Sequence, residues 1–490
     1  MPIFYSAILL TGVNLLLRLV STSFQVYITG RIGATGIGLL QLVMTVGGMS
    51  MTVGMAGIRT AAMYLTAEEL GKQKAGNVHW VLRGCFLYSL ICSGIVSVTV
   101  FLAAPYLAAN WIGNPQTVGA VRLFAVFLPV TCLSGVMSGY FTAANRIGTL
   151  AAVEVVEQLF SMGITIAGLA FWAGHDPVKS CQCVVLGSCV GSCLTFLVLL
   201  LLRTLENIRS ASRIPIFNRL FHTAAPLAIA DDLKAGINTA ENLMVPKRLS
   251  QYPGAKDPLA LFGTVSGMVF PVMMFPAAIL FGLAELLIPE LARCNAAGSK
   301  TRILYLVKRS LRVAMLYGCL FCGLLFLLSE ELCFALYHNS QAGEYLKWFS
   351  LMIPMLYCDA ITDAMIKGLG QQKISVRYNI LTSCMDIFLL YFLLPKYGIQ
   401  GYFASFLITH LINFCLSLNR LLKITGQKLP IFAPVLCLMS VITAIFLCLS
   451  IRGIVLRSIS FIAILGSLLT LLQILSKEDL LWIKGLLTKK

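Results

Sequence analysis

Apolar runs of about 20 residues follow one another along the whole chain, and short polar connections separate them. A helix of this length crosses a hydrocarbon core of about 30 Å. Because lipid offers no partners to backbone polar groups, the pattern predicts an all-α polytopic membrane protein with about 14 transmembrane helices. The expected spans are 5–28, 36–64, 81–104, 119–141, 149–173, 180–203, 221–245, 258–283, 305–328, 344–368, 377–394, 400–422, 431–451 and 455–475. The first is expected to be a retained span and not a signal peptide, because it lacks a positive leader.

A weak internal repeat relates the two halves of the chain. Residues 30–70 and 247–291 share a basic turn, a span rich in Gly, Met and Val, and an acidic end, and residues 140–146 resemble 365–371. Six spans repeated in parallel, with a path between the halves, form a transporter plan; chance similarity between apolar helices is the alternative. The repeat predicts two six-helix lobes and an appended hairpin. The expected parts are an N-lobe at 1–220, a C-lobe at 221–425, spans 13 and 14 at 426–475, and a cytoplasmic tail at 476–490.

Composition supports the membrane assignment, and charge orients the chain. The 490 residues are 58% hydrophobic and 12% charged, with a mean hydropathy of +0.87, which excludes a soluble domain. Connections after even-numbered spans, together with the C-terminal segment, hold 24 Lys and Arg residues, whereas the opposite connections hold nine. Because cytoplasmic loops collect basic residues, both termini are expected on the cytoplasmic side of a bacterial cell membrane. The net charge of +17 is then mainly a topology signal, and we expect no nucleic-acid partner.

The sixteen cysteines and five histidines form no pattern that carries chemistry. Most cysteines lie inside apolar runs, where a thiol acts as a small hydrophobe. The pairs Cys181 with Cys183 and Cys319 with Cys322 have no partner Cys or His in a loop, so packing is favoured over metal binding. We expect no disulfide framework, no metal, no cofactor and no catalytic residues. The expected protein is not an enzyme.

Residues 225–245, near the middle of the chain, carry four ionisable side chains in an otherwise apolar run. At about 100° per residue, Asp231, Lys234, Asn238 and Glu241 share one face of a helix, and Asp232 lies beside them. A charge at the bilayer centre costs at least about 2.5–3.5 kcal/mol, which favours a water-filled cavity over a lipid-facing surface. A helix shifted toward the interface is the alternative.

The first span carries a polar stripe at helical spacing. It includes Asn14, Arg18, Ser21 and Gln25, with Arg18 at its centre. Arginine stays charged at physiological pH, and its planar fork matches phosphate oxygens. Together with Arg59 on the second span and Lys234 on the seventh, the stripe predicts a cationic pocket suited to a pyrophosphate. Arg59 could instead extend to the cytoplasmic boundary.

The acids within the predicted spans have two interpretations: ion coupling, or a structural role. Asp231, Asp232 and Asp359 are candidates for proton or sodium coupling, because a partly buried carboxylate can exchange a cation as access alternates. Interhelical hydrogen bonds or placement at the interface are favoured for the other polar groups of the fifth, tenth and eleventh spans. Those groups are Glu154, Glu157, Gln158, Asp363, Lys367, Asn379, Ser383 and Asp386.

Three motifs resemble a known family: residues 31–42, the glycine-rich 54–58 with the acidic 67–69, and residues 243–249 after the seventh span. They are similar to the stage V sporulation protein B and polysaccharide-flippase branch of the multidrug/oligosaccharidyl-lipid/polysaccharide exporter superfamily. The resemblance covers nearly the whole chain. It implies two six-helix lobes around a V-shaped cavity, a lateral gate between spans 1 and 8, and a groove for a polyprenyl tail at spans 13 and 14.

In the related lipid II flippases, arginines on the first two spans and a basic residue early in the second lobe face the cavity. Arg18, Arg59 and Lys234 fit these places by span and not by a matched motif. The chain departs from the pattern in having fewer cavity arginines and an Asp231-Asp232 pair.

The expected function is therefore a flippase that moves an undecaprenyl-pyrophosphate-linked saccharide, such as a peptidoglycan precursor. Its expected partners are this substrate, membrane lipids and cell-wall synthesis enzymes.

Two alternatives remain open. A cation-coupled multidrug antiporter of the same superfamily would require a cavity acid in the first lobe, where the first span offers Arg18 and no carboxylate. A membrane-embedded glycosyltransferase or polymerase would require acids or histidines on a sizeable outer loop, but the outer connections are short.

Overall fold

A computed structural model describes residues 2–72, 75–174, 176–205, 216–427, 432–451 and 453–474; the side chains of 2–16, 18, 71, 75, 230, 432 and 433 lie outside this description. The described residues form helices and contain no strand, which confirms the all-α prediction. They divide into two compact units, Met1–Gly263 with Leu390–Gly398, and Thr264–Leu389 with Ile399–Lys490.

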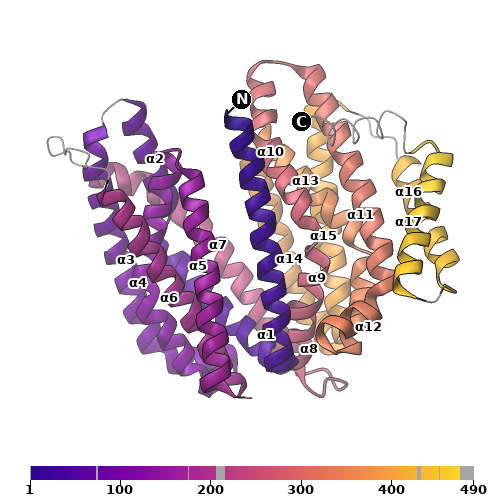
Figure 1. Ribbon diagram of the computed structural model, residues 1–490, viewed down its shortest axis with the longest axis horizontal. Coiled ribbons are helices and arrows are strands. Elements are labelled where there is room, and N and C mark those ends of the chain that lie inside the picture. The colour runs from indigo at the N-terminus through magenta and orange to yellow at the C-terminus, as the bar shows by residue number, and fades with distance from the viewer. Residues whose placement is uncertain are drawn as a thin grey trace. The chain divides into compact units, whose positions relative to one another are not determined.

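The helices of the first unit follow the first seven predicted spans (Figure 1). They are α1 (Pro2–Met55), α2 (Ile58–Gly71), α3 (Val78–Tyr106), α4 (Val118–Ala143), α5 (Ile147–Gly168), α6 (Pro177–Thr204), α7 (Phe217–Leu249) and most of α8 (Pro258–Thr264). The expected boundary stood at 220, whereas the contacts group α7 with α1 and α2 in the first unit. The predicted division into lobes related by a repeat stays a prediction.

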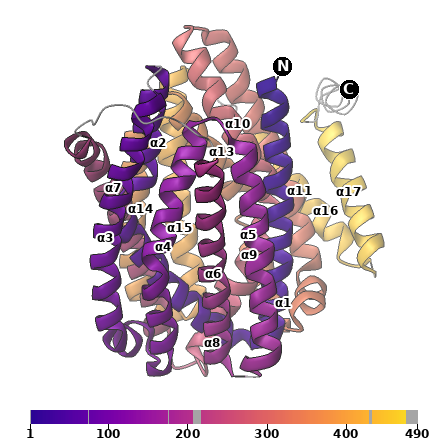
Figure 2. The same cartoon turned by 60° about the vertical axis from the view of Figure 1, so that its left-hand side comes forward.

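The second unit holds the remaining helices. They are α9 (Phe270–Met274), α10 (Ala277–Ala296), α11 (Lys300–Tyr337), α12 (Ser340–Ser350), α13 (Ile353–Gly368), α14 (Gln372–Tyr397, without its last turns), α15 (Ile399–Thr425), α16 (Phe432–Cys448) and α17 (Ile454–Leu471). The last two pack side by side and against α11, as expected for a hairpin (Figure 2). The predicted tail at 476–490 lies outside the described residues.

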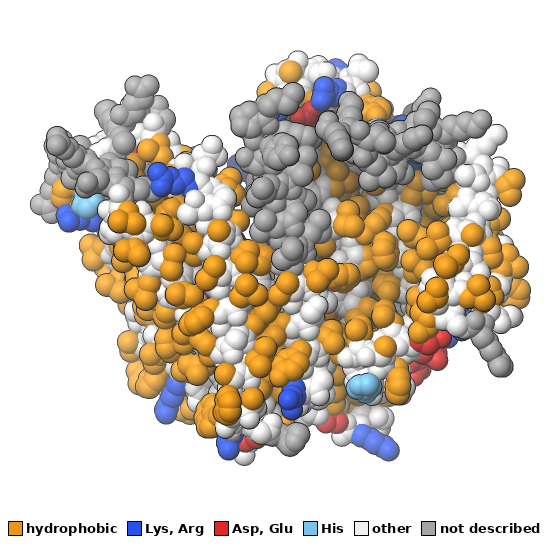
Figure 3. Space-filling model, in the orientation of Figure 1, with side chains coloured by type: hydrophobic (Ala, Val, Ile, Leu, Met, Phe, Trp, Pro, Cys, Tyr) orange, Lys and Arg blue, Asp and Glu red, His pale blue; other side chains and the backbone are white. Residues whose placement is uncertain are grey.

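Within the described part of the chain, nine helices are long and apolar enough to cross a membrane, or up to 11 if each of two bent helix pairs is one span. Figure 3 shows apolar side chains covering the walls of the helices, with Lys, Arg, Asp and Glu toward the ends. The protein is thus a multi-pass membrane protein. The exact number of 14 crossings stays a prediction, and α7 is not among the nine because its charges interrupt the apolar run.

Two glycines with positive φ shape the first 70 residues. Gly33 (φ 72°, ψ 179°) breaks α1 into two limbs, which correspond to the first predicted span and the start of the second. The second span was expected to be continuous over 36–64, but it breaks between Met55 and Ile58. There Gly57 has φ 70°, and a Cβ atom on it would lie 2.6 Å from the carbonyl oxygen of Ala224. Only glycine combines this conformation with so close an approach of α7.

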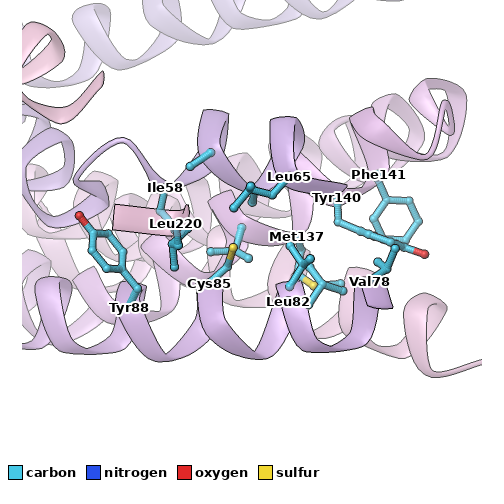
Figure 4. Close-up of a cluster of buried hydrophobic side chains, with 14 of the residues drawn as sticks. Ile58, Leu65, Val78, Leu82, Cys85, Tyr88, Met137, Tyr140, Phe141 and Leu220 are labelled. Carbon is cyan, nitrogen blue, oxygen red and sulfur yellow. The ribbon is translucent and has the colours of Figure 1, made fainter. Parts of the chain in front are cut away.

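A buried apolar cluster holds α2, α3, α4 and α7 together (Figure 4). Ile58 and Leu65 meet Cys85 of α3, Met137 of α4 and Leu220 of α7, each at most 5% exposed. In lipid, such close packing supplies most of the association energy, because the hydrophobic effect does not distinguish a helix partner from an acyl chain.

An ion-paired arginine fastens the start of α7 to the end of α2. Arg219 Nη1 lies 3.1 Å from Glu69 Oε1, and Nη2 lies 2.8 Å from Glu68 Oε2. Asn77 Nδ2 also donates to Glu69 Oε2, at 2.8 Å. The acidic end noted in the sequence at 67–69 is therefore a helix-helix junction.

Candidate functional site

A polar cavity of about 580 Å³ lies within the first unit. Both limbs of α1 line it, together with α5 and α6. Its described lining combines two carboxylates, three amides and four hydroxyls with six apolar side chains. The residues are Ser21, Phe24, Gln25, Ile28, Leu40, Gln41, Met44, Glu154, Glu157, Gln158, Ser161, Met162, Thr165, Val184 and Ser188.

Glycines on α6 let that helix approach α5 at the wall of the cavity. A Cβ atom on Gly187 would lie 2.7 Å from the carbonyl oxygen of Ser161, and one on Gly191 would lie 3.3 Å from Cγ of Glu157. Small residues four apart are the usual means of bringing membrane helices into contact. The approach places the hydroxyls of α6 within reach of the acids of α5.

Glu157 lines the cavity and is hydrogen-bonded through both carboxylate oxygens. Its Oε2 accepts a hydrogen bond from Thr195 Oγ1 at 2.6 Å, and its Oε1 accepts one from Ser192 Oγ at 3.1 Å. Thr195 is 2% exposed, so this contact is shielded from competing donors. The interhelical hydrogen bonding favoured for Glu157 from the sequence is confirmed, and the side chain lines the cavity as well.

The polar stripe of the first span reaches the same cavity through Ser21 and Gln25. Gln158 Nε2 of α5 donates to Ser21 Oγ and, at 3.4 Å, to the carbonyl oxygen of Leu17. Gln25 Nε2 is buried and has no hydrogen-bond partner among the described residues. An orphaned amide donor beside a cavity is a polar group that a ligand or water can satisfy.

Arg59 is exposed near the start of α2 and does not line the cavity. It interacts electrostatically with Glu154, a half-buried lining residue that also feels the like charge of Glu157. Arg59 therefore acts on the cavity from outside. Asn14 and Arg18, which the sequence places on the stripe, have side chains outside the described residues.

The charged face of α7 is present but lies apart from the cavity lining. Asp231, Lys234 and Asn238 are exposed, and Glu241 is half-buried. Asn238 accepts a hydrogen bond on its carbonyl oxygen from Asn242 Nδ2 at 2.9 Å. Beside this face, Asp232 Oδ1 is buried and has no partner among the described residues. The structure thus brings Gln25 to the cavity and leaves Lys234, Asn238 and Glu241 outside its lining.

Asp359 lies in the second unit, on α13, and pairs with α15. Its Oδ2 accepts a hydrogen bond from Asn413 Nδ2 at 3.0 Å. Within the described residues, Asp359 Oδ1 and Asn413 Oδ1 are both buried without a partner. Two buried acceptors with no donor form an unbalanced pair, which a cation or a proton would satisfy. Asp386 differs, because its Oδ1 accepts from Ser405 at 2.6 Å and from Thr409 at 3.2 Å.

Several residues of the site were not predicted from the sequence. Gln41, Ser161 and Ser188 line the cavity, and Ser192 and Thr195 hold Glu157. For the three residues on α6, the signal in the sequence is the spacing of glycines and hydroxyls over 187–195, within an apolar span. The described residues contain no cluster of three or more His, Cys, Asp or Glu side chains that could hold a metal ion.

Comparison with known proteins assigns the class first. The chain has the fold of the MOP superfamily of transporters. An inward-facing multidrug resistance MATE family transporter of that superfamily aligns with 86% of this chain and 100% of its own, at 13% identity and a TM-score of 0.67. The lipid II flippase MurJ, in an inward closed conformation, aligns with 95% of this chain and 98% of its own, at 11% identity and a TM-score of 0.71.

Sequence comparison points to more specific relatives than the fold does. Residues 4–231 match the family described as polysaccharide biosynthesis protein. Stage V sporulation protein B of Bacillus subtilis (strain 168) is 20% identical over 413 residues, which cover 80% of this chain and 78% of that protein. The resemblance inferred from the sequence motifs is confirmed: the chain is similar to stage V sporulation protein B.

Proposed function

We propose that this protein is a flippase that moves an undecaprenyl-pyrophosphate-linked saccharide from the inner to the outer leaflet of the cytoplasmic membrane by alternating access. The observation that carries the proposal is the polar cavity of the first unit, into which the stripe of the first span delivers Ser21 and Gln25. A hydrophilic headgroup crossing a bilayer needs such a wet, hydrogen-bonding path, while its lipid tail stays in the membrane. The family match over 4–231 supports a polysaccharide precursor as the cargo.

The pyrophosphate would be held by two basic side chains, Arg18 and Lys234. In the sequence, Arg18 precedes Ser21 by one helical turn on the stripe, and Lys234 is exposed on α7. Charge-assisted, bidentate contacts make arginine the stronger of the two anchors. Arg59, Asn14, Asn238 and Glu241 would contact the remaining headgroup as the chain changes conformation, and the α16-α17 hairpin would receive the polyprenyl tail. No covalent step is required.

Transport in one direction requires a free-energy source that distinguishes the two states. We assign this role to sodium or a proton at Asp359, with Asp231 and Asp232 as further candidates. The support is strongest at Asp359, where two buried acceptor oxygens lack a donor in the described structure. A bound cation would balance them and would leave when the site opens to the other side.

The test is a flipping assay in proteoliposomes with a fluorescent undecaprenyl-pyrophosphate-linked saccharide. We expect Arg18→Ala to slow transport by about tenfold or more, because a charge-assisted hydrogen bond contributes roughly 1.5–3 kcal/mol. Arg31→Ala is the matched control: Arg31 lies on the same helix, is exposed and stacks on Tyr27 at 6.0 Å. Unchanged transport in Arg18→Ala would refute the role of Arg18 in holding the pyrophosphate. Absence of transport by the wild type would refute the flippase function.

One observation favours a second function. A multidrug antiporter requires an acid in the cavity of the first lobe, and Glu154 and Glu157 line the cavity of the first unit. Organic-cation uptake, measured with ethidium in the same vesicles under a proton or sodium gradient, separates the two functions. Gradient-driven ethidium movement that Glu157→Gln abolishes, without saccharide transport, would favour the antiporter.

A further inference from the structure

The cavity of the first unit has a composition that selects among polar ligands. Its volume of about 580 Å³ lies within the range of roughly 300–1,000 Å³ that is typical of pockets for organic molecules. A bare inorganic ion would leave most of that space to water. The described lining is polar on the α5 side and apolar at Phe24, Leu40 and Met44, as suits a ring with hydroxyl groups at its edge.

The hydrogen-bonding capacity of the lining calls for a ligand that both donates and accepts. An ionised carboxylate has about four acceptor sites, and the hydroxyls of Ser192 and Thr195 occupy two of those on Glu157. The others can receive donors from a ligand. Gln25 Nε2 is a buried donor without a described partner, so it needs an acceptor. A sugar hydroxyl is donor and acceptor at once, whereas a metal cation binds oxygen atoms and cannot accept a hydrogen bond from the Gln25 amide.

The charge of the lining restricts the sugar further. The described lining residues include Glu154 and Glu157 and contain no Lys or Arg. Arg59 acts on Glu154 from outside the lining, so the described part of the lining keeps an acidic character. A carboxylate on the sugar would meet two like charges in the same cavity. A neutral sugar meets no such repulsion.

We propose that this cavity is the saccharide subsite of the transporter, and that Glu154 and Glu157 make it selective for neutral hydroxylated sugars over uronic acids. The inference rests on the proposed flippase function and names the substrate class that its cavity accepts. Glu157 is the fixed acceptor, Gln25 is the donor, and Glu154 adds a second acid to the same face of α5. The pyrophosphate lies outside this subsite.

The experiment compares two probes in proteoliposomes: undecaprenyl pyrophosphate linked to N-acetylglucosamine, and the same lipid linked to glucuronic acid. We expect the wild type to transport the neutral probe at least tenfold faster. Glu154→Gln keeps the shape and removes one charge, so the ratio should fall at least threefold. Glu330→Gln is the control, because Glu330 is an exposed residue of the second unit that faces Lys347, and it should leave the ratio unchanged.

Glu157→Gln could disturb the contact between α5 and α6, so a gain-of-charge variant completes the test. Gln25→Glu adds a third acid to the lining and should widen the ratio. Equal transport of both probes by the wild type, or ratios that none of these variants alters, would overturn the saccharide subsite and leave the flippase function standing. A variant that alters only the sodium dependence of transport would make the cavity a cation site and overturn the proposal. Transport of neither probe would refute the flippase function itself.

Discussion

Two half-buried carboxylates, Glu157 in the first unit and Asp359 in the second, differ in how their oxygens are hydrogen-bonded. Both oxygens of Glu157 accept hydroxyl hydrogen bonds from α6, and the side chain faces a cavity. Asp359 receives one hydrogen bond, from Asn413, and its other oxygen is buried without a described partner. A fully held acceptor has a fixed geometry and suits recognition of a ligand. An incompletely held acceptor is costly until something binds, so it suits an exchangeable cation.

The largest effect is expected from the removal of Glu157, the carboxylate with the more complete set of hydrogen bonds. Glu157→Ala removes the acceptor of Ser192 and Thr195 and should lower the apparent stability by about 2–3 kcal/mol, because hydrogen bonds to charged groups contribute roughly 1.5–3 kcal/mol. Asp359→Ala should cost about 1 kcal/mol or less, since it also removes a buried orphan oxygen. Thermal unfolding in detergent, followed by size-exclusion of the remaining monodisperse protein, measures both. Equal losses would show that the two acids are held alike.

The position of Glu157 depends on the approach of α5 and α6, which a single methyl group should disturb. Gly187→Ala would bring a Cβ atom to 2.7 Å from the Ser161 carbonyl oxygen and should cost about 1–3 kcal/mol by overpacking. Gly163→Ala is the matched control on α5, because nothing lies within 4 Å of its Cβ position, and it should stabilise by about 0.5–1 kcal/mol. Opposite shifts in melting temperature are expected. A Gly187→Ala protein as stable as the wild type would refute the close contact.

Cation binding tests Asp359, the carboxylate with the less complete set of hydrogen bonds. Sodium at ten times its dissociation constant should stabilise the wild type by about 1.4 kcal/mol through mass action, if it occupies the Asp359-Asn413 pair. Asp359→Asn should abolish this stabilisation, whereas Asp363→Asn, which breaks the ion pair with Lys367 on the same helix, should retain it. Melting curves in sodium chloride and in choline chloride measure the effect. Sodium stabilisation that persists in Asp359→Asn would place the cation elsewhere.

The smallest effects are expected on α7, where neighbouring aspartates differ in burial. Asp231→Asn should change apparent stability by less than about 0.5 kcal/mol, because the side chain is exposed. Asp232→Asn should raise stability by a few tenths of a kcal/mol or more, because it replaces a charge whose Oδ1 is buried without a described partner. The same melting assay applies. A larger effect at Asp231 than at Asp232 would contradict the observed exposures.

The sequence was a good guide to helices and a poor guide to the break within the second span. Apolar length located most of the helices, because a run of about 20 residues has only one way to satisfy its backbone in lipid. It missed the bends within the spans expected at 258–283 and 344–368, which are helix pairs bent by 63° and 58°. The interruption at Ala56 and Gly57 follows from the approach of α7 to the Gly57 backbone, a contact between residues about 170 positions apart. No local pattern encodes such a contact.

For the candidate site, Ser21 and Gln25 of the polar stripe on the first span are among the residues that line the cavity. Periodicity along one helix can place them on one face, because side-chain direction follows from 3.6 residues per turn. The acids of α5 were recognised as hydrogen-bonding groups, but their place at the cavity depends on α6, whose glycines and hydroxyls appear in the sequence as part of an apolar span. The partner of a polar side chain is chosen by helix packing.

By itself, then, the sequence determined that the chain is a helical membrane protein, that α7 carries a charged face, and that its relatives include stage V sporulation protein B. Only the tertiary structure decided that a polar cavity lined by Glu154 and Glu157 forms among α1, α5 and α6, and that Asp359 meets Asn413. The physical reason is the range of the interactions. Hydropathy and helical periodicity act within one helix, whereas cavities and buried hydrogen bonds arise between helices that only folding brings together.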